Sequence, residues 1–220
     1  MAFDLDGTLY PNYRFNIRLL PSLFKYWRLL SAFGKARKQL RIEQENQDFP
    51  SIYDYQTQKT AEFMRKPADQ IKEKIEKFIY KDWDRHFLKI KLFSHVKEVL
   101  TEFKAAGLKL AVLSDLPPEK KLKNLGLEGF WDTVLCSEKT GRLKPAARPF
   151  IELSNSLKIP AMQILYVGNR FDYDIIGASR AGMKTALIVK NTAKKPYPEG
   201  KVKTDFLFNN YRQLYDYVLK

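Results

Sequence analysis

The sequence predicts an α/β fold, a parallel β-sheet covered by helices on both faces. Three repeated units predict it, each an amphipathic stretch at helical spacing followed by a short apolar run. The helical stretches are residues 96–106, 147–157 and 174–181, and the apolar runs are 108–113, 164–167 and 185–189. Gly107 and Gly182 stand where the first and third helices should end. Strands that are apolar throughout are typical of parallel sheets buried on both faces.

The two ends of the chain supply the remaining elements of the sheet domain. Residues 205–208 read as a last short strand, 211–219 as a closing helix, and 191–200 as a loop. At the other end only Met1, Ala2 and Phe3 precede an acidic pair, whereas a central strand normally needs about five residues. We therefore expect the natural chain to begin upstream of Met1, because neighbouring strands would otherwise keep unpaired backbone groups.

Residues 11–90 differ from the rest of the chain. Apolar side chains recur there at helical spacing, with few β-branched runs, which predicts an inserted bundle of about four helices. The expected division is therefore an α/β core domain of residues 1–10 and 91–220, and a helical cap domain of residues 11–90. Because the insertion follows directly on the first strand, it should pack over the strand ends.

Composition narrows the class of protein. A 45% hydrophobic share in 220 residues is typical of a globular chain, and the net charge is +14. The basic residues are spread along the chain without a nucleic-acid-binding motif, so we expect no specific nucleic-acid partner. No apolar run is long enough to form a transmembrane segment. The single cysteine, Cys136, and the acidic residues where a signal peptide would be basic favour a cytoplasmic protein.

The first strand is followed by Asp4-Leu5-Asp6-Gly7-Thr8. Alternation along an extended segment places Asp4 and Asp6 on the same side, with the Thr8 hydroxyl beside them. Two carboxylates held this close need a cation or a shared proton between them. One can attack an electrophile while the other transfers protons, as phosphoryl transfer through an aspartyl-phosphate requires. The alternative is an ordinary surface turn, for which Asp and Gly are well suited.

Polar residues also follow the other predicted strands, at the sheet edge where ligands of open α/β folds bind. Ser114 and Asp115 could bind a phosphate or begin a helix. Lys144 could offset negative charge or be one more exposed lysine. Asn169 and Asp174 offer oxygen ligands of the kind that Mg²⁺ prefers.

Taken in order, these four motifs resemble those of haloacid dehalogenase superfamily phosphatases, and the resemblance extends over essentially the whole chain. It implies a Rossmann-like core with a C1-type helical cap, as in phosphoglycolate-phosphatase-like and β-phosphoglucomutase-like members. It further implies that Asp4 is the nucleophile and Asp6 the general acid/base. On this resemblance, the residues expected to bind the phosphoryl group and the rest of the substrate are Thr8, Ser114, Asp115 and Lys144, and Lys144 should also orient Asp4. The residues expected to bind Mg²⁺ are Asp4, Asp6 (through its main-chain carbonyl), Asn169 and Asp174.

One position departs from the family pattern. The fourth motif usually begins Gly-Asp, but here the acidic position is Asn169, while Asp174 matches the second acidic position. An asparagine keeps an oxygen ligand and removes one negative charge. We therefore expect weaker Mg²⁺ binding than a full set of aspartates would give.

The resulting interpretation is a Mg²⁺-dependent phosphatase for a small phosphorylated metabolite. Two alternatives remain. The first is a phosphomutase, which would use the same residues, and the second is a non-catalytic binding protein with a weakened metal site at Asn169. The basic amphipathic segment 14–41 leaves a further possibility, a helix that binds a membrane surface or a partner. The substrate and the oligomeric state are not predicted.

Overall fold

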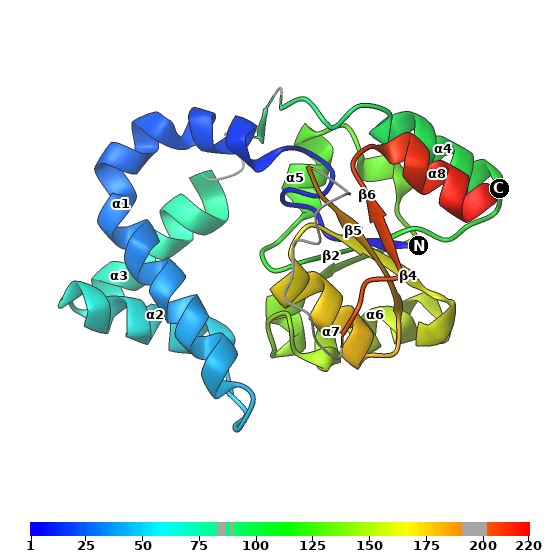
Figure 1. The fold of residues 1–220 in the computed structure, drawn as a ribbon. Coiled ribbons are helices and arrows are strands. Elements are labelled where there is room, and N and C mark those ends of the chain that lie inside the picture. Colours follow the sequence, from blue (N-terminus) through cyan, green and yellow to red (C-terminus); the bar gives the residue numbers. More distant parts are fainter. Residues whose placement is uncertain (83–86, 89, 191–201) are drawn as a thin grey trace.

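A six-stranded sheet with helices on both sides forms the larger part of the molecule, and a group of helices projects from it (Figure 1). This computed structural model describes residues 1–82, 87–88, 90–190 and 202–220. The loop expected over 191–200 lies outside these described residues.

The predicted parallel α/β sheet is confirmed. Its strands are β1 (Ala2–Phe3), β2 (Ala111–Ser114), β3 (Thr133–Cys136), β4 (Leu165–Gly168), β5 (Lys184–Ile188) and β6 (Phe206–Phe208). They lie in the order β3-β2-β1-β4-β5-β6, and every pairing is parallel. Although β1 has only two residues, it lies at the centre, with Ala2 opposite Ala111 on one side and Tyr166 on the other. The acidic pair therefore follows a central strand.

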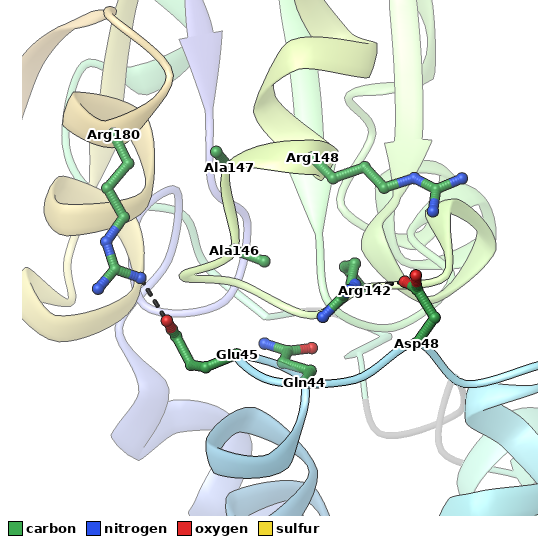
Figure 2. Close-up of a pocket in the computed structure, with 8 residues that line it drawn as sticks. All are labelled: Gln44, Glu45, Asp48, Arg142, Ala146, Ala147, Arg148 and Arg180. Atoms are coloured by element: carbon green, nitrogen blue, oxygen red, sulfur yellow. Dashed lines mark hydrogen bonds and ion pairs between the residues drawn. The ribbon is translucent and has the colours of Figure 1, made fainter.

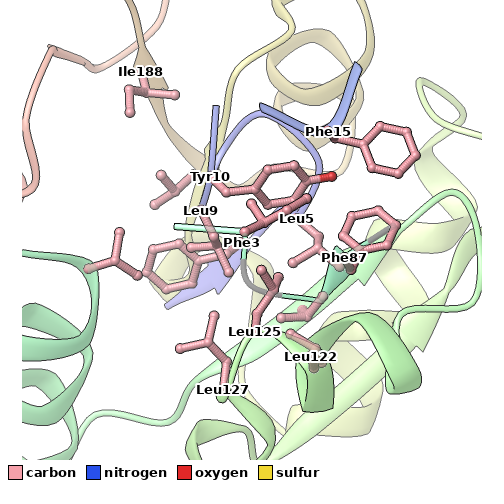
Figure 3. Packing of buried hydrophobic residues seen from close by; sticks show 14 of the residues in the cluster. Phe3, Leu5, Leu9, Tyr10, Phe15, Phe87, Leu122, Leu125, Leu127 and Ile188 are labelled. Carbon is pink, nitrogen blue, oxygen red and sulfur yellow. The ribbon is translucent and has the colours of Figure 1, made fainter. Parts of the chain in front are cut away.

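Alternate residues of each strand contact different helices. Ala2, Ala111 and Tyr166 belong to one buried cluster, which includes side chains of α6 (Ala147–Leu157) and α7 (Ile176–Arg180). Phe3 and Val112 belong to the cluster on the opposite face, which is covered by α4 (Val96–Ala105) and α8 (Tyr211–Leu219). Figure 3 shows this second cluster around Phe3, continuing through Tyr10 to Phe15. Both faces of the sheet are therefore covered by buried apolar side chains, as strands that are apolar throughout require.

The bounds of the predicted helices agree with the structure better than the bounds of the predicted strands. The helices 147–157 and 211–219 have the expected bounds, and α4 ends one residue early. The strand expected from 108 begins instead at Ala111, because the Leu108 amide donates to the Phe103 carbonyl and closes the end of α4. The strand expected from 164 begins at Leu165, since the Ile164 amide closes the short 3-10 turn Ala161–Gln163.

The segment between β1 and β2 is helical, as predicted, and its described residues form four consecutive helical elements. Its described residues contain α1 (Asn12–Glu43), α2 (Ile52–Met64), and α3 (Ala68–Lys74), which continues into a π-helical stretch, Ile75–Asp82. α1 is continuous for 32 residues, about 48 Å at 1.5 Å per residue. None of the described helices, α1 included, combines the length and apolarity needed to cross a membrane.

Short elements connect the sheet to the rest of the core. These elements have no clear periodicity in the sequence: α5 (Glu119–Asn124), the 3-10 turns Glu128–Phe130 and Ser137–Thr140, and the π-helical turn Phe171–Ile175 that precedes α7. The helix that the sequence predicts from residue 174 therefore becomes α-helical only at Ile176. α5 and the turn Ser137–Thr140 both carry residues of the candidate site.

Gly177 of α7 allows this helix to pack closely against α6. A Cβ atom at Gly177 would lie 2.3 Å from the Phe150 ring and 3.1 Å from the Pro145 Cα. We expect Gly177→Ala to lower the free energy of unfolding by about 1–3 kcal/mol, because an added methyl group must displace a buried ring. Denaturant unfolding of the purified protein measures this difference.

Gly34, in the interior of α1, provides the matched control. A Cβ atom there meets no heavy atom within 4 Å. Gly34→Ala should therefore raise the free energy of unfolding by about 0.5–1 kcal/mol, through helix propensity alone. Equal effects of the two substitutions would contradict the close packing of α7 on α6.

Candidate active site

The carboxyl ends of β1, β2 and β4 meet at one edge of the sheet and carry three of the four predicted motifs, while Lys144 lies in the loop before α6. Asp4 follows β1, Ser114 ends β2, and Asn169 follows β4. Because β1 lies between β2 and β4, the Asp4 amide still donates to the Val167 carbonyl at 2.9 Å. Strand order alone therefore brings together residues that are more than a hundred positions apart.

Lys144, the third motif, forms ion pairs with both the first motif and the fourth. Its ammonium lies 2.7 Å from Asp4 Oδ1 and 2.7 Å from Asp174 Oδ1, and all three residues are buried. Burial by itself would lower the pKa of Lys144, but Asp174 and Asp4 outweigh it and raise that pKa well above its usual range. Lys144 is therefore a permanent positive charge between the two carboxylates.

Asp4 is oriented by the turn that follows it. Thr8 Oγ1 donates to Asp4 Oδ2 at 2.8 Å and lies 3.5 Å from the Asn169 amide oxygen. Gly7 has φ +89°, and a Cβ atom there would be only 2.2 Å from the Asn169 side chain. The Gly7-Thr8 pair thus lets the fourth motif approach Asp4. Burial raises the pKa of Asp4, Lys144 opposes this, and Asp174 and Asp6 reinforce it.

Ser114 has an unused hydroxyl at the site. Its residue is fully buried, and its Oγ makes no hydrogen bond with any part of the chain that the structure describes. A buried polar group without a partner costs about 1–3 kcal/mol. An oxygen of a bound group, such as a phosphoryl oxygen, would satisfy it.

Asp6 is half-buried and is held by two side chains that the sequence analysis did not select. The Tyr10 hydroxyl donates to one carboxylate oxygen, and the Lys121 ammonium lies 2.7 Å from the other. Lys121 belongs to α5 and is itself buried. Tyr10 lies only four residues after Asp6, so the sequence does offer a signal for this contact. Nothing in the sequence distinguishes Lys121 from its neighbours Lys120 and Lys123.

Asp115 faces the helical segment. Its carboxylate accepts hydrogen bonds from Arg41 of α1, from Ser137 and from the Lys144 amide, and it lies 3.6 Å from Arg37. Burial would raise the pKa of Asp115, but Arg41 and Arg37 outweigh it and hold that pKa below its ordinary value. Its oxygens are therefore engaged by the protein itself, although it was expected to contact the substrate.

Further contacts hold the end of α1 and the π-helical stretch against the core around this edge. Arg37 also pairs with Glu138, which accepts a hydrogen bond from the Tyr80 hydroxyl. Gln44 makes two hydrogen bonds with the Leu143 backbone, one residue before Lys144. The end of α1 thus fixes the loop that carries the buried lysine.

A pocket of about 540 Å³ lies behind this loop (Figure 2). Its lining residues are Gln44, Glu45, Asp48, Arg142, Ala146, Ala147, Arg148 and Arg180. Two ion pairs bridge it from the end of α1 to the core, Arg180–Glu45 at 2.9 Å and Arg142–Asp48 at 2.6 Å. The pocket therefore lies between the residues that follow α1 and the core.

A smaller cavity of about 160 Å³ adjoins the other side of the site. It is lined by Ile79 and Tyr80 of the helical segment and by Leu116, Pro117, Glu119, Lys120 and Lys121 of the core. Because Lys121 also pairs with Asp6, this cavity opens beside the second carboxylate of the site.

The oxygen donors around Asp4 are of the type that a hard cation binds. They comprise the Asp4 and Asp174 carboxylates, the Asn169 amide oxygen and the main chain at Asp6. Among the described residues, no cluster of three or more His, Cys, Asp or Glu side chains could hold a metal. A cation here would therefore depend on amide and main-chain oxygens in addition to two carboxylates.

Comparisons with known proteins agree with this architecture. A family model described as haloacid dehalogenase-like hydrolase matches residues 1–188. The chain therefore belongs to the haloacid dehalogenase-like hydrolase family. The structure of L-2-haloacid dehalogenase from Xanthobacter autotrophicus with chloropropionic acid covalently bound superposes with a TM-score of 0.69. That match covers 99% of this chain and 96% of the other at 15% identity, which indicates a shared fold.

Two curated relatives carry phosphatase names. The glyceraldehyde 3-phosphate phosphatase of Methanocaldococcus jannaschii is 34% identical over 139 residues. The aligned region spans only 60% of this chain and 60% of that relative. A Clostridium perfringens protein named, by inference, pyrophosphatase PpaX is 27% identical over 224 residues, covering 100% of this chain and 97% of the other.

The acid stability of the protein should depend on Asp115. Because its pKa is lower in the folded than in the unfolded protein, its contribution to stability is present above the ordinary carboxyl value near 4 and is lost as pH falls below it. We expect Asp115→Asn to lower the free energy of unfolding by about 2 kcal/mol at neutral pH, because Arg37 and Arg41 lose a charged partner.

Denaturant unfolding of both proteins at several pH values between neutral and acidic tests this. The difference between wild type and Asp115→Asn should shrink steadily as the pH falls below about 4. A difference that is constant with pH would mean that the Asp115 charge does not stabilise the junction.

Proposed function

We propose that the chain is a phosphatase that acts on a small phosphorylated metabolite through an aspartyl-phosphate on Asp4. The observation that carries the proposal is the buried Ser114 hydroxyl, which lacks a partner among the described residues and ends the strand beside Asp4 and its partner Lys144. A phosphoryl group bound there would receive hydrogen bonds from Ser114 and charge compensation from Lys144. The phosphatase names of the two relatives support the same class of reaction.

In this proposal the reaction has two steps. The Asp4 carboxylate attacks phosphorus, the bond from phosphorus to the ester oxygen breaks, and Asp6 gives its proton to the departing alkoxide. Water then attacks the phosphoryl group, Asp6 takes the proton of that water, and the bond between phosphorus and Asp4 breaks to release phosphate. Thr8 keeps Asp4 oriented during both steps through its hydrogen bond to Oδ2.

A bound Mg²⁺ would be held by Asp4, the main-chain carbonyl of Asp6, Asn169 and Asp174. It would supply positive charge next to the transferring phosphoryl group. The charges of the site favour a further cation: three carboxylates (Asp4, Asp6 and Asp174) face only two lysines, Lys144 and Lys121. With Asn169 in place of a carboxylate, the metal would be bound less tightly than in a fully acidic site.

We further propose that residues 11–90 act as a cap domain that limits the substrate to small molecules. The cavity of about 160 Å³ lies where this segment meets α5, beside the Lys121–Asp6 pair. A leaving group protonated by Asp6 would occupy it. The volume admits a leaving group of a few carbon atoms and leaves little room for a nucleoside.

The proposal predicts hydrolysis of p-nitrophenyl phosphate that requires Mg²⁺. Asp4→Asn should abolish turnover, because an amide cannot form the acyl phosphate. Asp6→Asn should lower kcat by about 10²–10⁴-fold, the range of general acid–base catalysis. Colorimetric steady-state assays with and without EDTA measure these effects.

Asp172→Asn is the matched control, since it changes a carboxylate in the same fourth-motif loop that the proposed mechanism does not use. Its kcat should stay within about threefold of wild type, because exposed substitutions away from the reacting groups have small effects. Full activity in Asp4→Asn would exclude Asp4 as the nucleophile. Absence of any phosphatase activity in wild type, across a panel of small phosphate esters, would favour a non-catalytic protein.

Asn169→Asp should strengthen metal activation. Adding a carboxylate to the oxygen donors should lower the Mg²⁺ concentration for half-maximal activity by roughly tenfold, since charge count tunes affinity in such sites. Titration of activity against Mg²⁺ for both proteins measures the shift. An unchanged Mg²⁺ dependence would remove Asn169 from the proposed metal site.

A further inference from the structure

The outward face of α1 carries a stripe of exposed apolar side chains. Tyr13, Ile17, Leu20, Phe24 and Trp27 recur at intervals of three or four residues, which places them along one side of the helix. Their exposed fractions run from 49% for Leu20 to 86% for Phe24. The stripe is about 21 Å long at 1.5 Å per residue. In Figure 1 this half of α1 forms the outer edge of the helical segment.

This stripe is not needed for the core of the helical segment. The inward face of the same helix supplies that core through Phe15, Leu19 and Leu29, which are at most 7% exposed. Five of the eleven large apolar side chains that are exposed among the described residues lie in the stripe. A contiguous exposed apolar surface of this kind marks an interaction site, whereas single exposed residues do not.

The charges around the stripe identify the chemistry of its partner. From residue 12 to residue 42, α1 contains eight Lys or Arg residues and no Asp or Glu. Two of the eight, Arg37 and Arg41, pair with Asp115 and Glu138 of the core and do not belong to the outward face. Lys25 and Arg28 are exposed beside Phe24 and Trp27, and Lys35 and Lys38 continue the same outward face towards the end of the helix. The partner should therefore be both apolar and negatively charged.

We propose that the outward face of α1 binds the surface of an anionic lipid bilayer. Phe24, Trp27 and their neighbours in the stripe enter the boundary between headgroups and acyl chains, and the surrounding Lys and Arg side chains contact lipid phosphates. Helices that lie in this interface combine an apolar face containing Trp, Phe and Leu with flanking basic residues. The negative surface potential of such a membrane attracts each of the exposed cations. The helix lies along the surface and does not cross it.

A second copy of this chain fits the same surface less well. A two-fold interface through α1 would bring the same surface of both copies together. The basic side chains of one helix would then face those of the other, without an acidic residue on either α1 between residues 12 and 42. Like charges facing each other across an interface are unfavourable.

Sedimentation of the full chain with lipid vesicles tests the proposal. The vesicles contain phosphatidylcholine alone, or phosphatidylcholine with about one third phosphatidylserine as the anionic lipid. Wild type should bind the anionic vesicles and be released by high salt, and it should bind the neutral vesicles at least about tenfold more weakly. Phe24→Ser/Trp27→Ser and Lys25→Gln/Arg28→Gln should each weaken binding at least about tenfold.

Ile151→Ser/Met162→Ser and Lys184→Gln/Lys203→Gln are the matched controls, because they change exposed residues of the same types on the core. They should bind like wild type, and circular dichroism melting should show that all four variants remain folded. Wild type that stays in solution with anionic vesicles would overturn the proposal, as would equal losses in the control variants. A dimer that Phe24→Ser/Trp27→Ser dissociates, with no vesicle binding by wild type, would assign the surface to a second copy.

Discussion

The arrangement of this protein depends on one buried cation, Lys144, held between the carboxylates of Asp4 and Asp174 at 2.7 Å each. Removing one partner of a buried ion pair costs several kcal/mol, so the three residues are stable only together. They come from the loops after β1 and β4 and from the loop before α6. The pairing therefore locks the carboxyl edge of the sheet and positions Asp4 at the same time.

The loop that carries Lys144 is in turn held from the side of the helical segment. Gln44 bonds the backbone of Leu143, and Arg41 donates to the Lys144 carbonyl at 2.9 Å while pairing with Asp115. The end of α1 thus contacts both the second motif and the lysine loop. This gives α1 two separate roles along its length: its C-terminal half organises the candidate active site, and its N-terminal half presents the apolar stripe.

Much of this site could be predicted from the sequence, since Asp4, Ser114, Lys144 and Asp174 each follow or precede a segment with a clear periodicity. Buried parallel strands place their carboxyl ends at one edge, which brings Asp4, Ser114 and Asp174 together, whereas Lys144 is selected only through the resemblance of the four motifs to the family pattern. Lys121 and Arg41 could not be found in this way. Both are single cations among 39 Lys and Arg residues, and only the tertiary packing of α5 and α1 shows which of them face a carboxylate.

Chemical trapping of the phosphorylated enzyme tests the central claim most directly. The protein is mixed with Mg²⁺ and a substrate, quenched during turnover, and treated with borohydride, which reduces an acyl phosphate on aspartate to homoserine. The account predicts homoserine at position 4 in the peptide mass spectrum, dependent on the presence of substrate. Homoserine at position 6, or steady turnover without conversion at any aspartate, would contradict it.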